Sequence, residues 1–199
     1  MTARATPGDL SHGYEAAAAD YAARRNPEIG AVEVARWAAS LPAGATVLDV
    51  GCGTGVPIAK TLLDSGLKVW ALDASPSMAA AFGRNFPAVP VVCEAVERSD
   101  LFARRFDAAI AWGLLFLLEP ETQAAAVRNI ARALHPGGCL LFTSPADACE
   151  WTDVLTRMRS VSLGREAYRE LLSSAGLVLA AEYDDEGGNH YYESRRCEA

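Results

Sequence analysis

Residues 47–55 read VLDVGCGTG, and this stretch decides the fold class of the chain. A short apolar run ends at Asp49-Val50, and a turn that contains Gly51, Gly53 and Gly55 follows it directly. Glycines permit a tight turn and let a ligand approach the backbone closely. In an open α/β sheet, ligands bind beyond the carboxyl ends of the strands, which is where this turn would lie. The stretch therefore predicts a strand, a ligand-binding turn and a helix.

The rest of the chain alternates between strand and helix patterns. The strand segments are apolar throughout, which is typical of a sheet covered on both faces. The acidic turn at 184–188 resembles a hairpin turn, so the last strand is expected to be antiparallel. The pattern predicts a doubly wound α/β fold with a seven-stranded, mostly parallel sheet and helices on both faces. Strands are expected at 45–50, 67–72, 89–93, 106–112, 138–143, 177–183 and 189–196, and helices at 10–25, 28–40, 57–65, 76–85, 121–134 and 166–175.

Composition restricts the classes of function. The chain has 199 residues, of which 51% are hydrophobic and 22% charged, as expected for one globular domain. A net charge of -7 argues against a nucleic-acid partner. No apolar run approaches the roughly 18 residues of a membrane span, so no membrane is expected as a partner. The five cysteines are scattered without a C-x-x-C pair, so we expect no metal site and a reducing, cytoplasmic location.

A second acid helps to identify the ligand. Asp73 ends the second predicted strand, 22 positions after Gly51, where a carboxylate can accept hydrogen bonds from both hydroxyls of a ribose. A dinucleotide fingerprint would need a third glycine at the position of Val56. Asp49 would repel a pyrophosphate but suits a cationic ligand. These features favour S-adenosylmethionine, which carries a sulfonium and an ammonium group and no phosphate.

Over about residues 10–195 the chain resembles the class I S-adenosylmethionine-dependent methyltransferases, which have a Rossmann-like sheet. The motifs that carry the resemblance are VLDVGCGTG (47–55), VWALDASPSM (69–78), CEAVE (93–97), FDAAIAWGLLFLL (106–118) and LHPGGCLLF (134–142). It implies S-adenosyl-L-methionine as cofactor and S-adenosyl-L-homocysteine as product. The cofactor contacts that it implies are Tyr21, Arg25, Asp49, Gly51, Cys52, Gly53, Asp73, Ala74, Glu94, Ala95 and Trp112.

The resemblance also implies how a single domain, 1–199, is divided. Residues 1–40 would form an N-terminal helical lid, 45–144 the cofactor-binding core, and 145–199 the substrate side. If the acceptor must be deprotonated, the candidate bases are His190 and, second, Tyr14. A free amine or a thiolate would need no base. The less specific interpretations are that Asp73 only caps a helix and that His190 is a surface residue.

We expect methyl transfer to the O, N or S atom of a small molecule by in-line displacement, without a metal. Residues 112–115 lack the D/N-P-P-Y/F motif of amino-DNA methylation, and 112–118 contain no acidic residue for a metal. Two alternatives stay open. The chain could be a non-catalytic S-adenosylmethionine-binding partner subunit, or an NAD-dependent oxidoreductase, which Val56 disfavours. The sequence is compatible with a monomer or a homodimer.

Overall fold

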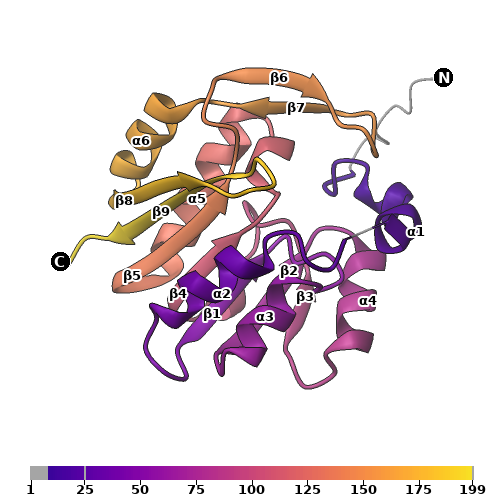
Figure 1. The fold of residues 1–199 in the computed structure, drawn as a ribbon, viewed down its shortest axis with the longest axis horizontal. Coiled ribbons are helices and arrows are strands. Elements are labelled where there is room, and N and C mark those ends of the chain that lie inside the picture. The colour runs from indigo at the N-terminus through magenta and orange to yellow at the C-terminus, as the bar shows by residue number, and fades with distance from the viewer. Residues whose placement is uncertain (1–8, 25, 199) are drawn as a thin grey trace.

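A seven-stranded sheet runs through the centre of the molecule (Figure 1). The computed structural model describes residues 9–24 and 26–198. The strand order is β3-β2-β1-β4-β5-β9-β8, in which β9 alone is antiparallel to the neighbours on both its sides. The predicted fold class is thereby confirmed. The strands are β1 (Thr46–Val50), β2 (Lys68–Asp73), β3 (Val91–Cys93), β4 (Phe106–Ala111), β5 (Leu134–Thr143), β8 (Leu177–Asp184) and β9 (His190–Arg196).

Helices cover both faces of the sheet, because successive strand residues point to opposite faces. Val47 packs in a hydrophobic cluster with α2 and α3, whereas its neighbour Leu48 packs in a second cluster with α5 and α6. Both side chains are fully buried. The helices are α1 (Tyr14–Arg24), α2 (Ala31–Ala39), α3 (Ile58–Asp64), α4 (Pro76–Asn85), α5 (Pro120–Ala133) and α6 (Arg165–Ser174), with short 3-10 turns η1 (Leu101–Ala103) and η2 (Leu115–Leu117).

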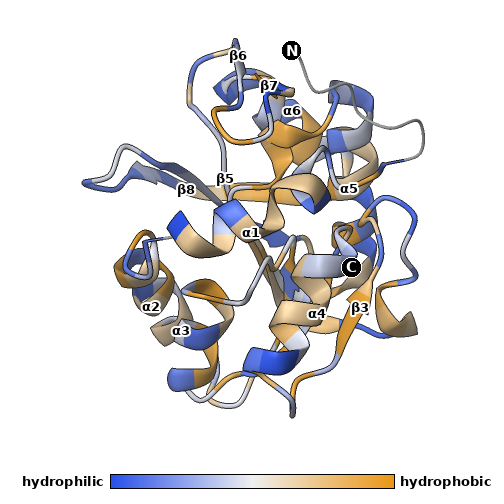
Figure 2. Ribbon diagram, turned by 90° about the vertical axis from the view of Figure 1, so that its right-hand side faces the viewer, coloured by the Kyte–Doolittle hydropathy of each residue, from blue (hydrophilic) through white to orange (hydrophobic). Residues whose placement is uncertain are grey.

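The first two helices have different positions in the fold. No residue of α1 is buried, and this helix crosses the middle of the face that Figure 2 shows. In α2, by contrast, Val34, Trp37 and Ala38 are buried in the core. Within the predicted lid, only α1 therefore has the exposed position that a lid needs. The division into lid, core and substrate side stays a prediction.

A second, two-stranded sheet was not predicted from the sequence. β6 (Cys149–Thr152) and β7 (Arg159–Ser162) form an antiparallel hairpin between β5 and α6, and its turn reaches toward α1 (Figure 1). Its strands, CEWT and RSVS, are too short and polar to show the apolar alternation by which strands are recognised. Tertiary contacts hold it instead, because buried Gln123 donates hydrogen bonds to the carbonyls of Leu118 and Val161, both at 2.9 Å.

In the part of the chain that the structure describes, no helix has the length and apolar character needed to cross a membrane. Within the same residues, no group of three or more His, Cys, Asp or Glu side chains could hold a metal ion.

Candidate cofactor and acceptor site

The carboxyl ends of β1, β2 and β4 meet at one edge of the sheet. The register pairs Val50 with Leu72 and Asp49 with Ile110, so these three strands end side by side. The backbone N–H groups of Gly51 and Cys52 both donate to the carbonyl of Leu72, at 2.9 and 3.0 Å. The glycine turn is thus fixed against β2 just before that strand ends.

Asp73 organises this edge. Its Oδ2 accepts a hydrogen bond from Gly53 N at 2.8 Å, and its Oδ1 accepts one from Ser75 N at 2.8 Å. Burial raises the pKa of Asp73, although the two backbone hydrogen bonds act in the opposite direction. A carboxylate offers about four lone-pair sites, so acceptor sites remain for a ligand. The N-cap of α4 is Ser75, whose Oγ accepts from Met78 N at 3.2 Å, and Asp73 supports that cap from outside the helix.

Asp49 lies beneath the glycine turn with only 2% of its surface exposed. Its Oδ2 is buried and has no hydrogen-bond partner among the described residues. Burial, together with the negative charge of Asp73, raises the pKa of Asp49 to about 8. An unpaired buried carboxylate is costly, and a cation nearby would lower that cost.

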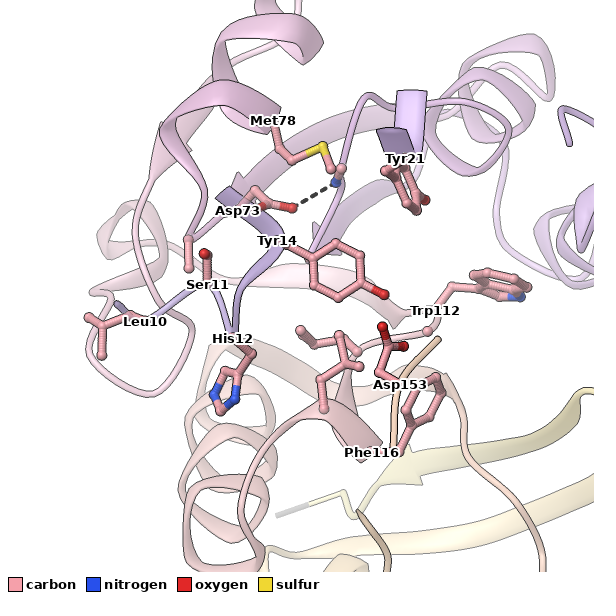
Figure 3. A pocket seen from close by; sticks show the side chains of 16 residues that line it. Leu10, Ser11, His12, Tyr14, Tyr21, Asp73, Met78, Trp112, Phe116 and Asp153 are labelled. Carbon is pink, nitrogen blue, oxygen red and sulfur yellow. Dashed lines mark hydrogen bonds between the residues drawn. The ribbon is translucent and has the colours of Figure 1, made fainter. Parts of the chain in front are cut away.

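Two adjoining pockets lie at this edge. The larger one is shown in Figure 3, and the predicted residues that line it are Tyr14, Tyr21, Gly51, Gly53, Asp73, Ala74 and Trp112. The smaller one is lined by Glu94 and Ala95 and shares Gly51, Asp73 and Ala74 with the larger. Its volume is only about 20 Å³, and Leu10 lines both pockets.

The structure does not bring every predicted site residue into these pockets. Arg25 lies outside the described residues. Asp49 and Cys52 line neither pocket. Cys52 is buried, and burial raises the pKa of its thiol, so it packs beneath the turn as a small apolar residue.

His190 is buried, with only 5% of its surface exposed. The less specific interpretation, in which it is a surface residue, is therefore wrong. The Nδ1 of His190 lies 2.7 Å from Asp184 Oδ1, and its ring stacks edge-on against Tyr192 with centroids 4.7 Å apart. His190 lines neither pocket, so the structure does not bring it together with Tyr14. Its Nε2 is buried without a partner among the described residues. The roles of both residues in catalysis stay predictions.

Sequence reasoning missed several residues that line the larger pocket. His12 and Phe116, which are not among the predicted site residues, both line it and are labelled in Figure 3. Asp153, from the turn of the β6–β7 hairpin, lines it as well. The sequence carries no signal for Asp153, since neither the hairpin nor the direction of its turn could be predicted.

Trp112 is held in place by a chain of hydrogen bonds. Its Nε1 donates to Tyr191 Oη at 3.1 Å, and Tyr191 Oη donates to Asp185 Oδ2 at 3.0 Å. The indole also lies against Gly30, where a Cβ would come within 2.7 Å of Nε1 and where φ is +81°. Only glycine fits that position without a shift of the indole. Trp112 is therefore a rigid wall of the larger pocket.

The chemistry of these residues fits a nucleoside cofactor with a cationic tail. Asp73 has acceptor sites for ribose hydroxyls, and the orphaned Asp49 oxygen lies beneath the turn. A Cβ at Gly53 would lie 3.5 Å from the Tyr21 ring, in ordinary van der Waals contact, so Tyr21 of α1 lies directly over the backbone of the glycine turn. The fold and this site define an α/β protein that binds a nucleoside cofactor at the carboxyl edge of its sheet.

Comparisons with known proteins agree with this class. Residues 47–138 match the sequence model of a family described as "Methyltransferase domain". The chain is 38% identical over 151 residues to a malonyl-[acyl-carrier protein] O-methyltransferase of Enterobacter lignolyticus, covering 73% of this chain and 59% of the relative. It is 37% identical over 128 residues to a cypemycin N-terminal methyltransferase of Streptomyces, covering 62% and 51%. The chain thus spans a little over half the length of these two relatives.

Solved structures show the same fold. The CcbJ methyltransferase of Streptomyces caelestis superposes with a TM-score of 0.76 at 20% identity, covering 95% of this chain and 98% of that one. At this identity the likeness shows the fold, and the family is shown by the sequence matches, at 47–138 and to the relative that is 38% identical. The chain belongs to the class I S-adenosylmethionine-dependent methyltransferases.

Proposed function

We propose that this protein transfers a methyl group from S-adenosyl-L-methionine to a small-molecule acceptor. The observation that carries the proposal is the hydrogen bond of 2.8 Å from Gly53 N to Asp73 Oδ2, which joins the glycine turn to the acid that we propose binds the ribose. When bound, the cofactor supplies an electrophilic methyl group on a sulfonium, and the acceptor displaces that group in line.

The residues of this chain would bind the cofactor in a defined order along the sheet edge. Glu94 and Ala95 would contact the adenine, and Asp73 would accept hydrogen bonds from the ribose hydroxyls. Asp49 would stabilise the cationic tail through the turn, either directly or through water. Tyr21, which lies against Gly53, would cover the cofactor from the side of α1.

The acceptor would lie on the other side of the larger pocket. Phe116 and Trp112 line that side, and Tyr14 lies between it and Asp73 in Figure 3. These aromatic walls would position the acceptor and exclude water, which is most of what an in-line displacement requires from an enzyme. Tyr14 is the candidate base predicted from the sequence that lines this pocket, and His12, which lines the same pocket, is a second group that can accept a proton.

The names of the relatives leave the acceptor atom open. One is named as an O-methyltransferase of a malonyl group on a carrier protein, and another as an N-terminal methyltransferase of cypemycin. We propose a metal-independent transfer to a small molecule.

Calorimetry with the purified chain tests the proposal. S-adenosyl-L-homocysteine should bind with a micromolar dissociation constant, which is about -8 kcal/mol. NAD should bind more weakly, and tighter binding of NAD would overturn the assignment of the cofactor. A labelled-methyl transfer assay with metabolite extracts then separates an enzyme from a silent partner subunit, because the latter binds without producing labelled product.

A further inference from the structure

Asp153 is a carboxylate of the larger pocket that the cofactor chemistry does not require. It is 9% exposed and lies at the start of the turn that joins β6 to β7. Figure 3 shows its carboxylate beside Phe116, with Tyr14 between it and Asp73. A buried carboxylate at this position needs a physical reason, because its removal from water is costly unless a partner compensates.

The turn holds Asp153 in one orientation. Its Oδ1 accepts hydrogen bonds from Leu155 N at 2.9 Å, from Thr156 N at 2.7 Å and from Thr156 Oγ1 at 3.1 Å. All three bonds use the same oxygen. The second oxygen, Oδ2, makes none of the hydrogen bonds that fix the turn, so the carboxylate is pre-organised and retains acceptor sites.

The hairpin itself is fixed to the body of the protein. Arg159 forms an ion pair at 2.6 Å with Glu119, which lies outside the hairpin, and the Trp151 ring packs on Phe116 with centroids 5.3 Å apart. A second ion pair of Arg159, with Glu150 at 2.5 Å, joins β7 to β6 within the hairpin. At the turn, a Cβ on Gly13 would come within 3.1 Å of Thr156 Cβ, which places the turn against the start of α1. Asp153 is therefore held rigidly over the acceptor side of the pocket.

The described residues that line the larger pocket include two carboxylates, Asp73 and Asp153, and the imidazole of His12. Four aromatic residues line it too, and aromatic faces attract cations: Tyr14, Tyr21, Trp112 and Phe116. An anionic acceptor would be repelled by both carboxylates, whereas an alcohol would leave the Asp153 charge uncompensated.

We propose that the acceptor is an amine that enters as an ammonium ion, and that Asp153 binds this ammonium. This inference rests on the proposed methyltransferase function. During transfer the nitrogen lone pair forms the new C–N bond while the C–S bond breaks and sulfur keeps its electron pair. The ammonium must first lose one proton, which His12 in the same pocket can accept before releasing it to water. The product nitrogen then carries the positive charge.

The test uses the chain loaded with S-adenosyl-L-homocysteine and three probes of similar shape: benzylamine, benzyl alcohol and benzoate. In the wild type, benzylamine should bind at least about tenfold tighter than benzyl alcohol, as expected for a hydrogen-bonded charge pair. Benzoate should bind more weakly than either. Asp153→Asn keeps Oδ1 for the turn but removes the charge, so it should abolish the preference for the amine. Asp147→Asn, at an exposed position in the segment before the hairpin, is the matched control and should keep it.

Each outcome decides the inference. A wild type without a preference for benzylamine, or an Asp153→Asn variant that retains one, overturns it. If Asp153→Asn weakens binding of S-adenosyl-L-homocysteine tenfold, the carboxylate serves the cofactor's own ammonium, and the inference also fails. A second variant, Thr156→Val, removes a hydroxyl that donates to Asp153 and accepts from Met158 N but leaves the Asp153 carboxylate in place, so it should retain the amine preference. Failure of the wild type to bind S-adenosyl-L-homocysteine would instead contradict the proposed function.

Discussion

Ser75 Oγ donates a hydrogen bond of 2.5 Å to Glu15 Oε2, and this bond ties α1 to the N-terminus of α4 across 60 positions of sequence. Ser77 adds two more, from its backbone N to Oε2 at 2.9 Å and from its Oγ to Oε1 at 2.7 Å. A carboxylate is stabilised at a helix N-terminus by the free N–H groups and the helix dipole. Since α1 buries none of its residues, these bonds are a main attachment of α1 over the site.

Replacing Glu15 should therefore loosen α1. Glu15→Gln removes the charge at the helix N-terminus, so we expect faster amide hydrogen exchange in residues 14–24 and faster entry and release of S-adenosyl-L-homocysteine. Glu121→Gln, in the exposed first turn of α5, is the matched control. Stopped-flow binding and hydrogen exchange measure both effects. Unchanged exchange in α1 would show that other contacts hold it.

The attachment of α1 should also weaken in acid. The hydrogen bonds from Ser75 and Ser77 lower the pKa of Glu15. A carboxylate whose pKa is lower in the folded state stabilises that state above its unfolded pKa, and the stabilisation is lost as the pH falls through the folded pKa. Protection of residues 14–24 in the wild type should thus decline below about pH 4, and Glu15→Gln should lack that decline.

Asp73→Ala should weaken binding of S-adenosyl-L-homocysteine by roughly 2–3 kcal/mol, because a charged acceptor for ribose hydroxyls is lost. The substitution also leaves Gly53 N and Ser75 N without their acceptor, so the glycine turn should become more mobile. Asp73→Asn keeps one acceptor oxygen and should lose less affinity. Calorimetry measures both, and an unchanged dissociation constant in Asp73→Ala would restrict Asp73 to supporting the cap of α4.

Asp49 should make the folded state less stable as the pH rises. Its pKa is about 8 in the fold and about 4 when unfolded. Between these values the folded state keeps a proton that the unfolded chain has released, so the free energy of unfolding falls by up to about 1.4 kcal/mol per pH unit. Asp49→Asn cannot titrate. Its stability relative to wild type, from urea unfolding, should rise between about pH 4 and pH 8, and a constant difference would contradict the prediction.

Tyr191→Phe should destabilise the wall of the larger pocket. The variant leaves Trp112 Nε1 without its acceptor and removes one donor from Asp185. A buried group that loses its partner costs about 1–3 kcal/mol. Tyr192→Phe is the control, because its hydroxyl makes only a long bond of 3.4 Å to the carbonyl of Pro145. Urea unfolding should give Tyr191→Phe a lower free energy of unfolding than Tyr192→Phe. Equal losses in the two variants would show that the hydrogen-bond chain does not stabilise the fold.

His190→Ala tests whether a residue that lies outside both pockets takes part in catalysis. Because His190 lines neither pocket, we expect the variant to keep the wild-type dependence of rate on pH and to lose stability instead. Tyr14→Phe is the comparison within the pocket. Loss of one limb of the pH profile with a fall in rate of about 10²–10⁴-fold in His190→Ala would establish it as the general base.

Local pattern was sufficient for the seven strands of the central sheet and for the helices α1 to α6, but not for β6 and β7. The glycine turn and Asp73 could be predicted because adjacent parallel strands end together, so residues that follow successive strands must meet. Helix α4 was predicted with its observed bounds, since Ser75 and Pro76 form a cap and first turn that are independent of distant contacts.

Only the tertiary structure decided which side chains share the acceptor side of the pocket. Asp153 is there because a polar hairpin is fixed by Gln123 and Arg159, and His190 is absent because its ring packs into the protein against Tyr192. Glu15 reaches Ser75 across the site in the same way. These positions depend on packing between segments far apart in the chain, whereas the periodicity of apolar residues reports only which face of its own element a residue occupies.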